Sequence, residues 1–182
     1  MLATFALADL LDYTDWQRRL WFDWLRERGE PILDIGAGPG GDGRFEKVGD
    51  LIRHIFSAEK RYVERLTNRP ITDPATISVS NIEALFQFGE QSRREFRQFL
   101  EVLPDGCTDV PLELNILNRP LTVTPRKVVM HVLLHEVRHW AQIATLLRLN
   151  GQKVELHDFL FSSVLGDPFR RDSHAAPGSR SR

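Results

Sequence analysis

Three histidines spaced by four residues are the side chains of this sequence best suited to chemistry. His131, His135 and His139 lie in the segment MHVLLHEVRHWAQ, whose apolar residues follow a helical period. On a helix, residues four apart stack on one face about 6 Å from each other, so two imidazoles can converge on one metal ion at about 2.1 Å. His131 and His139 are about 12 Å apart in axial rise. We therefore expect one adjacent pair to bind an ion together with a ligand from elsewhere.

His54 could supply that third ligand. It lies in DLIRHIFSAEKRYVERL, at the edge of another helical apolar stripe. Three imidazoles leave coordination positions open, which separates a catalytic metal site from a closed structural one. The alternative is that the pair are core histidines bonded to neighbouring helices and that His54 is a partly exposed surface residue. His157 and His174 fall outside the long helices and receive no role.

Residues 135–139 match the H-E-x-x-H pattern of zinc peptidases literally. In that mechanism Glu136 would act as the general base on a bound water. The extended pattern fails, because Gln142 stands where glycine is needed and Thr145 replaces the last histidine. We keep a peptidase as the least favoured alternative. Glu136 or Glu59 could also shuttle protons in another reaction, although a solvated position on a helix is the plainer expectation for both.

The stretch Ile32–Gly40, ILDIGAGPG, looks like the glycine loop of a nucleotide-dependent methyltransferase. That loop requires a buried strand before it, a helix after it and a further strand with an acidic residue. The sequence around it is helical and does not alternate. We therefore interpret the stretch as a flexible connection.

Four long amphipathic segments must position these residues. The expected helices cover residues 3–28, 45–66, 80–103 and 124–150. Ser80 with Glu83 forms a capping-box pattern, and Thr124 with Pro125 is typical of a helix start. The pattern predicts an all-α four-helix bundle over residues 1–165. VPLELNIL and RPLTV could form a short hairpin between the third and fourth helices, residues 155–163 a short fifth helix, and residues 166–182 a disordered tail.

Composition limits the partners. The 182 residues carry a formal net charge of −1, and 42% are hydrophobic, so no electrostatic reason points to nucleic acid or an anionic membrane. No apolar run approaches the length that spans a bilayer. The single cysteine, Cys107, allows no intrachain disulfide and no thiolate cluster, which fits a reducing cytoplasm.

The aromatic set around Trp16, Trp21 and Trp24 has the spacing of core packing, whereas Trp140 is expected to be exposed or at a subunit contact.

Taken together, three segments resemble the DinB-like (DinB/YfiT) superfamily of metal-binding four-helix bundles. They are LLDYTDWQRRLWFDWL, FEKVGDLIRHIFSAEKRYVERL and MHVLLHEVRHWAQIATLLRLNGQKVELHDF. The family's ligands are one histidine on the second helix and two on the last long helix, which map onto His54, His135 and His139. His131 matches a frequent family histidine that is not normally a ligand. The family often reads His-Arg-Gly-Gln where this chain reads His139-Trp140-Ala141-Gln142, so the metal ligands are kept and the chemistry at the rim of the site departs.

The resemblance implies a homodimer and a small-molecule substrate. Some relatives are metal-dependent transferases or isomerases that act with low-molecular-weight thiols. We therefore expect a divalent ion, zinc or nickel, that activates a thiol or a water for transfer or hydrolysis. The rival hypothesis is a metal-stabilised structural or sensing module without turnover.

Overall fold

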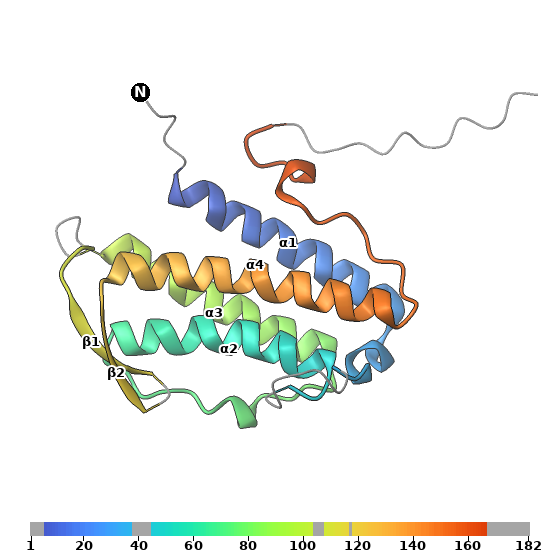
Figure 1. Cartoon of the computed structure of the whole chain (residues 1–182), viewed down its shortest axis with the longest axis horizontal. Coiled ribbons are helices and arrows are strands. Elements are labelled where there is room, and N and C mark those ends of the chain that lie inside the picture. The colour runs from blue at the N-terminus through green and yellow to red at the C-terminus, as the bar shows by residue number, and fades with distance from the viewer. Residues whose placement is uncertain (1–5, 38–44, 104–107, 117, 167–182) are drawn as a thin grey trace, which may run out of the picture.

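Four long helices dominate the computed structural model, which describes residues 6–37, 45–103, 108–116 and 118–166 (Figure 1). They are α1 (Leu7–Arg28), α2 (Val48–Leu66), α3 (Ile82–Val102) and α4 (Pro125–Leu149). A hairpin of β1 (Leu112–Ile116) and β2 (Arg119–Val123) precedes α4. Short 3-10 helices cover Glu30–Asp34, Pro74–Thr76 and Phe159–Phe161. The expected helical bundle is thus present, but the two-stranded sheet means that the chain is not purely α-helical.

The start of α4 follows its sequence signal, whereas two other predictions fail in detail. The Thr124 hydroxyl accepts a hydrogen bond from the Lys127 amide at 3.2 Å and caps the helix. The third helix is capped by Asn81 and not by Ser80, because the Asn81 side chain accepts the Ala84 amide at 2.7 Å. The fifth helix expected over residues 155–163 is reduced to the 3-10 turn Phe159–Phe161.

Buried residues form two apolar clusters, one toward each end of the bundle. One cluster holds the end of α1, the start of α2, the start of α3 and the end of α4, with Trp21, Ile52, Leu85, Trp140 and Ile143 among its members. The other holds the opposite ends of the same helices, with Leu10, Val63, Phe96, Val129 and Leu133 among its members. Between the two clusters, each helix contributes a buried charged residue: Arg18, Glu59, Arg93 and Glu136. A layer of charge therefore divides the core at the middle of the bundle.

The hairpin covers one end of α2 and α4 (Figure 1). β1 and β2 pair antiparallel, with Leu112 opposite Val123 and Leu114 opposite Leu121. Leu114 and Val123 are buried in the second apolar cluster, while Leu121 remains half exposed. The hairpin predicted from VPLELNIL and RPLTV is confirmed, and its apolar face extends the core beyond the helices.

The connection between α1 and α2 is better anchored than a flexible link. Ile32 and Leu33 are buried in the first cluster, and a bridge pairs Gly36 with Lys47. The residues before Gly36 form a 3-10 helix and not the buried strand that a methyltransferase loop requires. Residues 38–44 of that stretch, and residues 167–182 of the predicted tail, lie outside the described residues. None of the described helices is long and apolar enough to cross a membrane.

Candidate metal centre

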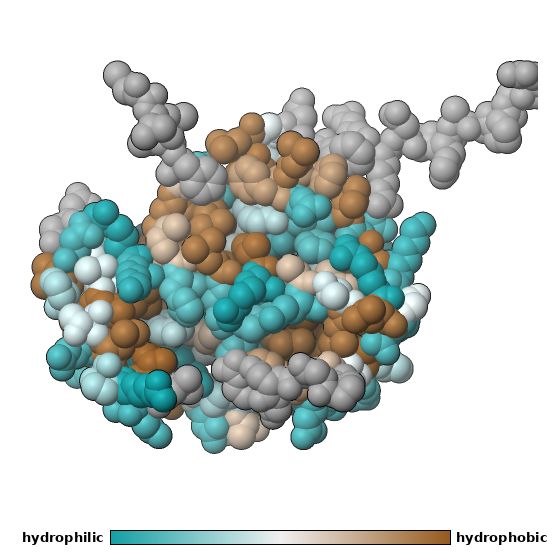
Figure 2. Space-filling view, viewed as in Figure 1, coloured by the Kyte–Doolittle hydropathy of each residue, from teal (hydrophilic) through white to brown (hydrophobic). Residues whose placement is uncertain are grey.

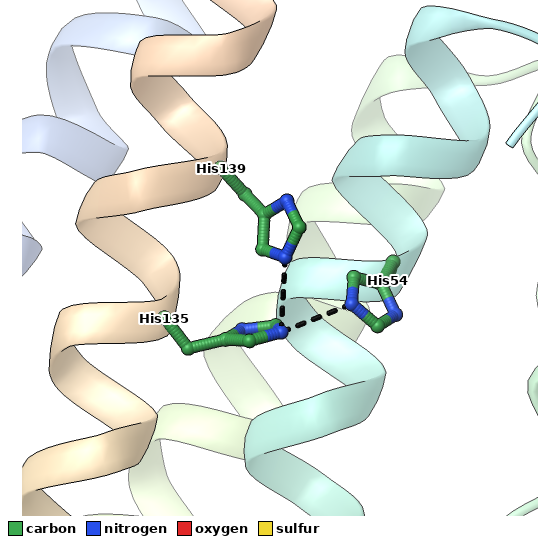
Figure 3. A group of neighbouring side chains, drawn as sticks. All are labelled: His54, His135 and His139. Carbon is green, nitrogen blue, oxygen red and sulfur yellow. Dashed lines mark hydrogen bonds between the residues drawn. The ribbon is translucent and has the colours of Figure 1, made fainter. Parts of the chain in front are cut away.

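The three candidate histidines meet on the face shared by α2 and α4 (Figure 3). His54 comes from α2, and His135 and His139 stand one helical turn apart on α4. His54 is half-buried, while His135 and His139 are 9% and 3% exposed. Because their rings point at one another from two helices, the structure brings together the set that the sequence suggested.

The separations of the ring nitrogens fit a common ion. The Nε2 of His135 lies 3.0 Å from the Nε2 of His54 and 3.0 Å from the Nε2 of His139. Two nitrogens bound to one ion at about 2.1 Å lie roughly 3.0–3.4 Å apart at octahedral or tetrahedral angles. One ring nitrogen from each histidine lies within 4.8 Å of the others, so the three form a group that could hold one ion. An imidazole nitrogen carries either one hydrogen or one lone pair, so His135 Nε2 alone cannot satisfy both neighbours, whereas a cation satisfies all three.

Two neighbours orient the ring of His139. Its Nδ1 lies 2.5 Å from Oε1 of Gln142, one turn further along α4, and donates its hydrogen there. That hydrogen bond leaves the Nε2 lone pair directed at the other two rings, which is how ligating histidines are usually held. The ring of Phe45, just before α2, lies with its centroid 4.6 Å from that of His54 and 6.1 Å from that of His139. Phe45 therefore shields one side of the cluster.

His135 is held as a neutral imidazole, which is the form that binds metals. Burial lowers the pKa of His135 to about 2, with the nearby rings of His139 and His54 acting in the same direction. A neutral imidazole has a free lone pair, and metal binding therefore displaces no proton from His135 near neutral pH.

Glu136 lies in the charged layer of the core and not among the histidines. Its carboxylate accepts hydrogen bonds from Arg18 at 2.6 and 2.8 Å and from Arg93 at 2.6 Å, and also from the indole of Trp140 at 3.2 Å. Burial raises the pKa of the Glu136 carboxyl, but the two guanidinium groups outweigh it and lower the pKa below its usual range. The expectation of a solvated residue was wrong, and a carboxylate engaged in this way does not serve as the general base of an H-E-x-x-H peptidase.

Glu59 and Trp140 also differ from their predictions. Glu59 is 1% exposed; it accepts a hydrogen bond from the Ser92 hydroxyl at 2.8 Å and lies 3.2 Å from both Arg18 and Arg93. Trp140 is fully buried and stacks on Trp21 with ring centroids 5.3 Å apart. Neither residue is at the surface, because on both α2 and α4 the helix face turned away from the histidines points into the core.

His131 stands beside the cluster and not in it. Its ring packs edge-on against Tyr62 at 5.2 Å and lies 5.5 Å from the ring centroid of His135. The metal-compatible group among the described residues contains only His54, His135 and His139. Helical spacing left either adjacent pair open, and the family resemblance pointed to His135 and His139. The structure groups this pair with His54, while His131 borders the cavity next to it.

Comparisons with known proteins agree with this architecture. A model of the DinB family matches residues 1–165. The chain belongs to the DinB family. No curated protein sequence matches it. A DinB-like protein from Bacillus cereus has a similar structure, with a TM-score of 0.60 and 16% identity over 79% of this chain and 89% of that one. A DinB-like protein from Bacillus subtilis gives 0.55 and 13% over 81% and 96%. At these identities the two structures support the fold of this DinB-family chain, not its activity.

Sequence reasoning missed three arginines beside the histidines. Arg61 and Arg65 follow His54 on the same face of α2, and Arg138 follows His135 by three residues on α4. The sequence does contain this information, because Arg61 and Arg65 follow His54 by seven and eleven residues, which is close to two and three helical turns. Arginine is not a metal ligand, so the pattern of candidate ligands does not include these positions.

Proposed function

We propose that this DinB-family protein binds one divalent metal ion, zinc or nickel, through His54, His135 and His139, and that it acts as a transferase or hydrolase on a small molecule. The observation that carries the proposal is the meeting of three Nε2 atoms, two of them 3.0 Å from the third. Three neutral nitrogen donors suit both metals. A divalent cation held there lowers the pKa of a thiol or water beside it and so supplies a nucleophile at neutral pH.

The protein's own residues would prepare that chemistry. Gln142 fixes the orientation of the His139 ring, and Phe45 screens one side of the cluster. A cavity of about 260 Å³ adjoins the cluster on the side of His131 and is lined in part by His54 and His135. A substrate entering this cavity would lie beside two of the three residues that would hold the ion.

Metal content tests the first half of the proposal. Purified protein should contain about one equivalent of zinc or nickel, and His135→Ala should contain far less. His131→Ala is the matched control, because it removes an imidazole from the same helix outside the cluster, and it should keep the metal. Equal metal content in all three proteins would overturn the proposal.

Thiol consumption tests the second half against the structural or sensing alternative. That alternative has support in the same geometry, since an ion held by His54 and His135 would clip α2 to α4. If metal removal lowers the melting temperature but the loaded protein conjugates no thiol to an activated aryl halide, and hydrolyses no activated ester, the structural role is correct. The homodimer and the cytoplasmic location stay predictions, the first checked by light scattering.

A further inference from the structure

The cavity beside the three histidines has an unusual charge. Its lining consists of His54, Ala58, Arg61, Tyr62, Arg65, Ile116, His131, His135 and Arg138, and it encloses about 260 Å³. Three of these residues are arginines, and none is acidic. The cavity lies between α2 and α4, which run side by side in Figure 1. Figure 2, viewed from the same side, shows hydrophilic residues across the middle of the molecule. A chain with a net charge of −1 thus concentrates positive charge at one place.

These arginines lack the carboxylate partners that other arginines of the protein have. Arg18 and Arg93 are paired with Glu59 and Glu136 in the core. In the described part of the chain, no ion pair involves an arginine of the cavity. The cavity arginines therefore have no carboxylate of the described residues within ion-pair distance, although the nearby charge of Glu64 acts on Arg65.

The contacts that the cavity arginines do make are weak substitutes. Arg65 donates to the backbone carbonyl of Arg61 at 3.2 Å and lies over the ring of Tyr62 at 5.7 Å. The buried Nε of Arg61 has no hydrogen-bond acceptor within the described residues. Burial lowers the pKa of Arg65, and the neighbouring charge of Arg61 lowers it further, while Tyr62 and Glu64 act in the opposite direction. A buried donor without an acceptor is costly, and such sites are commonly satisfied by a ligand or water.

The arginines are also placed to act together with the metal centre. Arg138 lies beside the cluster: its Nη2 is 3.2 Å from Nε2 of His139 and donates to that lone pair here, so it would be free for another acceptor once an ion takes the lone pair. Side chains on a helix lean toward its N-terminus, which directs Arg61 and Arg65 toward His54. A guanidinium group presents paired donors that match the two oxygens of a carboxylate or phosphate. The cavity is too small for a macromolecule and suits a ligand of a few to a dozen heavy atoms.

We propose that this cavity binds an oxyanion group, a carboxylate or a phosphate, of the substrate whose reacting end lies at the three histidines. The inference rests on the proposed function and names its substrate class: a small anionic molecule, held at Arg61, Arg65 and Arg138. The arginines fix the anion, and the histidine end of the cavity receives the thiol or water that reacts.

Three thiols of matched length test this preference. They are 3-mercaptopropionate, 2-mercaptoethanol and cysteamine, which carry a negative, no and a positive charge. With cobalt(II)-loaded protein, the thiolate-to-cobalt absorption band reports each Kd. We expect 3-mercaptopropionate to bind about tenfold or more tighter than 2-mercaptoethanol, the size expected for one charge-assisted hydrogen bond. Cysteamine should bind weakest.

Variants separate the arginines from the metal's own attraction for a carboxylate. The double variant Arg61→Gln with Arg65→Gln, and Arg138→Gln separately, should reduce the tenfold preference toward one while cobalt content is unchanged. Arg94→Gln, an exposed arginine of α3 outside the cavity, is the control and should keep it. A preference that is equally large in the double variant, or absent in the unmodified protein, would overturn the inference while leaving the metal site intact.

Anion binding without metal gives an independent measurement. Chelated protein is melted in inorganic phosphate or succinate against chloride at equal ionic strength. We expect phosphate or succinate to raise the melting temperature of the unmodified protein and of Arg94→Gln but not of the double variant, and the larger rise identifies which oxyanion fits. If the protein binds no metal, this arm still decides the inference: equal melting in all three salts refutes it.

Discussion

Replacing Glu136 by glutamine distinguishes a core residue from a catalytic one. The carboxylate is 2% exposed and contacts the guanidinium groups of Arg18 and Arg93, which are 3% and 4% exposed. At about 4 Å, one ion pair contributes about 4 kcal/mol at the effective dielectric of a protein site. Removing one partner of a buried ion pair typically costs about 3–5 kcal/mol. Here Arg18 and Arg93 would keep Glu59 but lose the carboxylate that holds each of them most closely.

We therefore expect Glu136→Gln to lower the free energy of unfolding by about 3–5 kcal/mol. Urea titration of the metal-free protein, followed by circular dichroism, measures this value. Glu101→Gln at an exposed position of α3 is the control, and its effect should stay within about 0.5 kcal/mol. An H-E-x-x-H peptidase would behave in the opposite way, with normal stability and lost hydrolysis. A stability of Glu136→Gln within 0.5 kcal/mol of the unmodified protein would refute the reasoning.

Three further predictions follow from other contacts. Gln142→Leu removes the acceptor that holds His139 Nδ1, so isothermal titration should show metal affinity about 10–100-fold weaker, with stability of the metal-free protein little changed. Gly89→Ala places a Cβ 2.9 Å from three ring atoms of the fully buried Phe56. We expect this substitution to lower the free energy of unfolding in urea by about 1–3 kcal/mol. An unchanged unfolding midpoint would contradict the close packing of α2 and α3. Burial lowers the pKa of His157, so the folded state favours the neutral ring. The contribution of this ring to the free energy of unfolding is therefore present above about pH 6.5 and is lost as the pH falls. His157→Gln should accordingly lose less stability between about pH 7.5 and 5.5 than the unmodified protein does.

The helices and the candidate ligands on α4 could be predicted because both depend on a local period. An apolar stripe repeats along a helix whatever it packs against, and His135 with His139 shares a face of that helix by geometry alone. His54 required a second step, since nothing in the sequence gives the distance between two helices. The family resemblance supplied that step, and the 3.0 Å separation from His135 agrees with it.

The roles of Glu136, Glu59 and Trp140 could not be predicted by the same reasoning. A charged residue is expected at the surface because burial is costly, and only a partner from another helix reverses that expectation. Glu136 has two such partners, Arg18 from α1 and Arg93 from α3, separated from it by more than forty residues of sequence. Since pairs of this kind leave no local periodic signal, the sequence suggested solvent where the structure has a buried network.

The buried network also bears on the metal centre, although it does not touch it. Glu136 follows His135 directly, so the ion pairs to α1 and α3 fix the rotation of α4 that aims His135 and His139 at α2. A rotation of about 20° moves a side-chain tip roughly 6 Å from the helix axis by about 2 Å. Metal–ligand distances tolerate only about 0.2 Å. We therefore expect Glu136→Gln to weaken metal binding in calorimetric titrations even where the protein remains folded, while Glu101→Gln leaves it unchanged. Unaltered metal affinity in Glu136→Gln would mean that the packing of Trp140 and its neighbours alone fixes the orientation of α4.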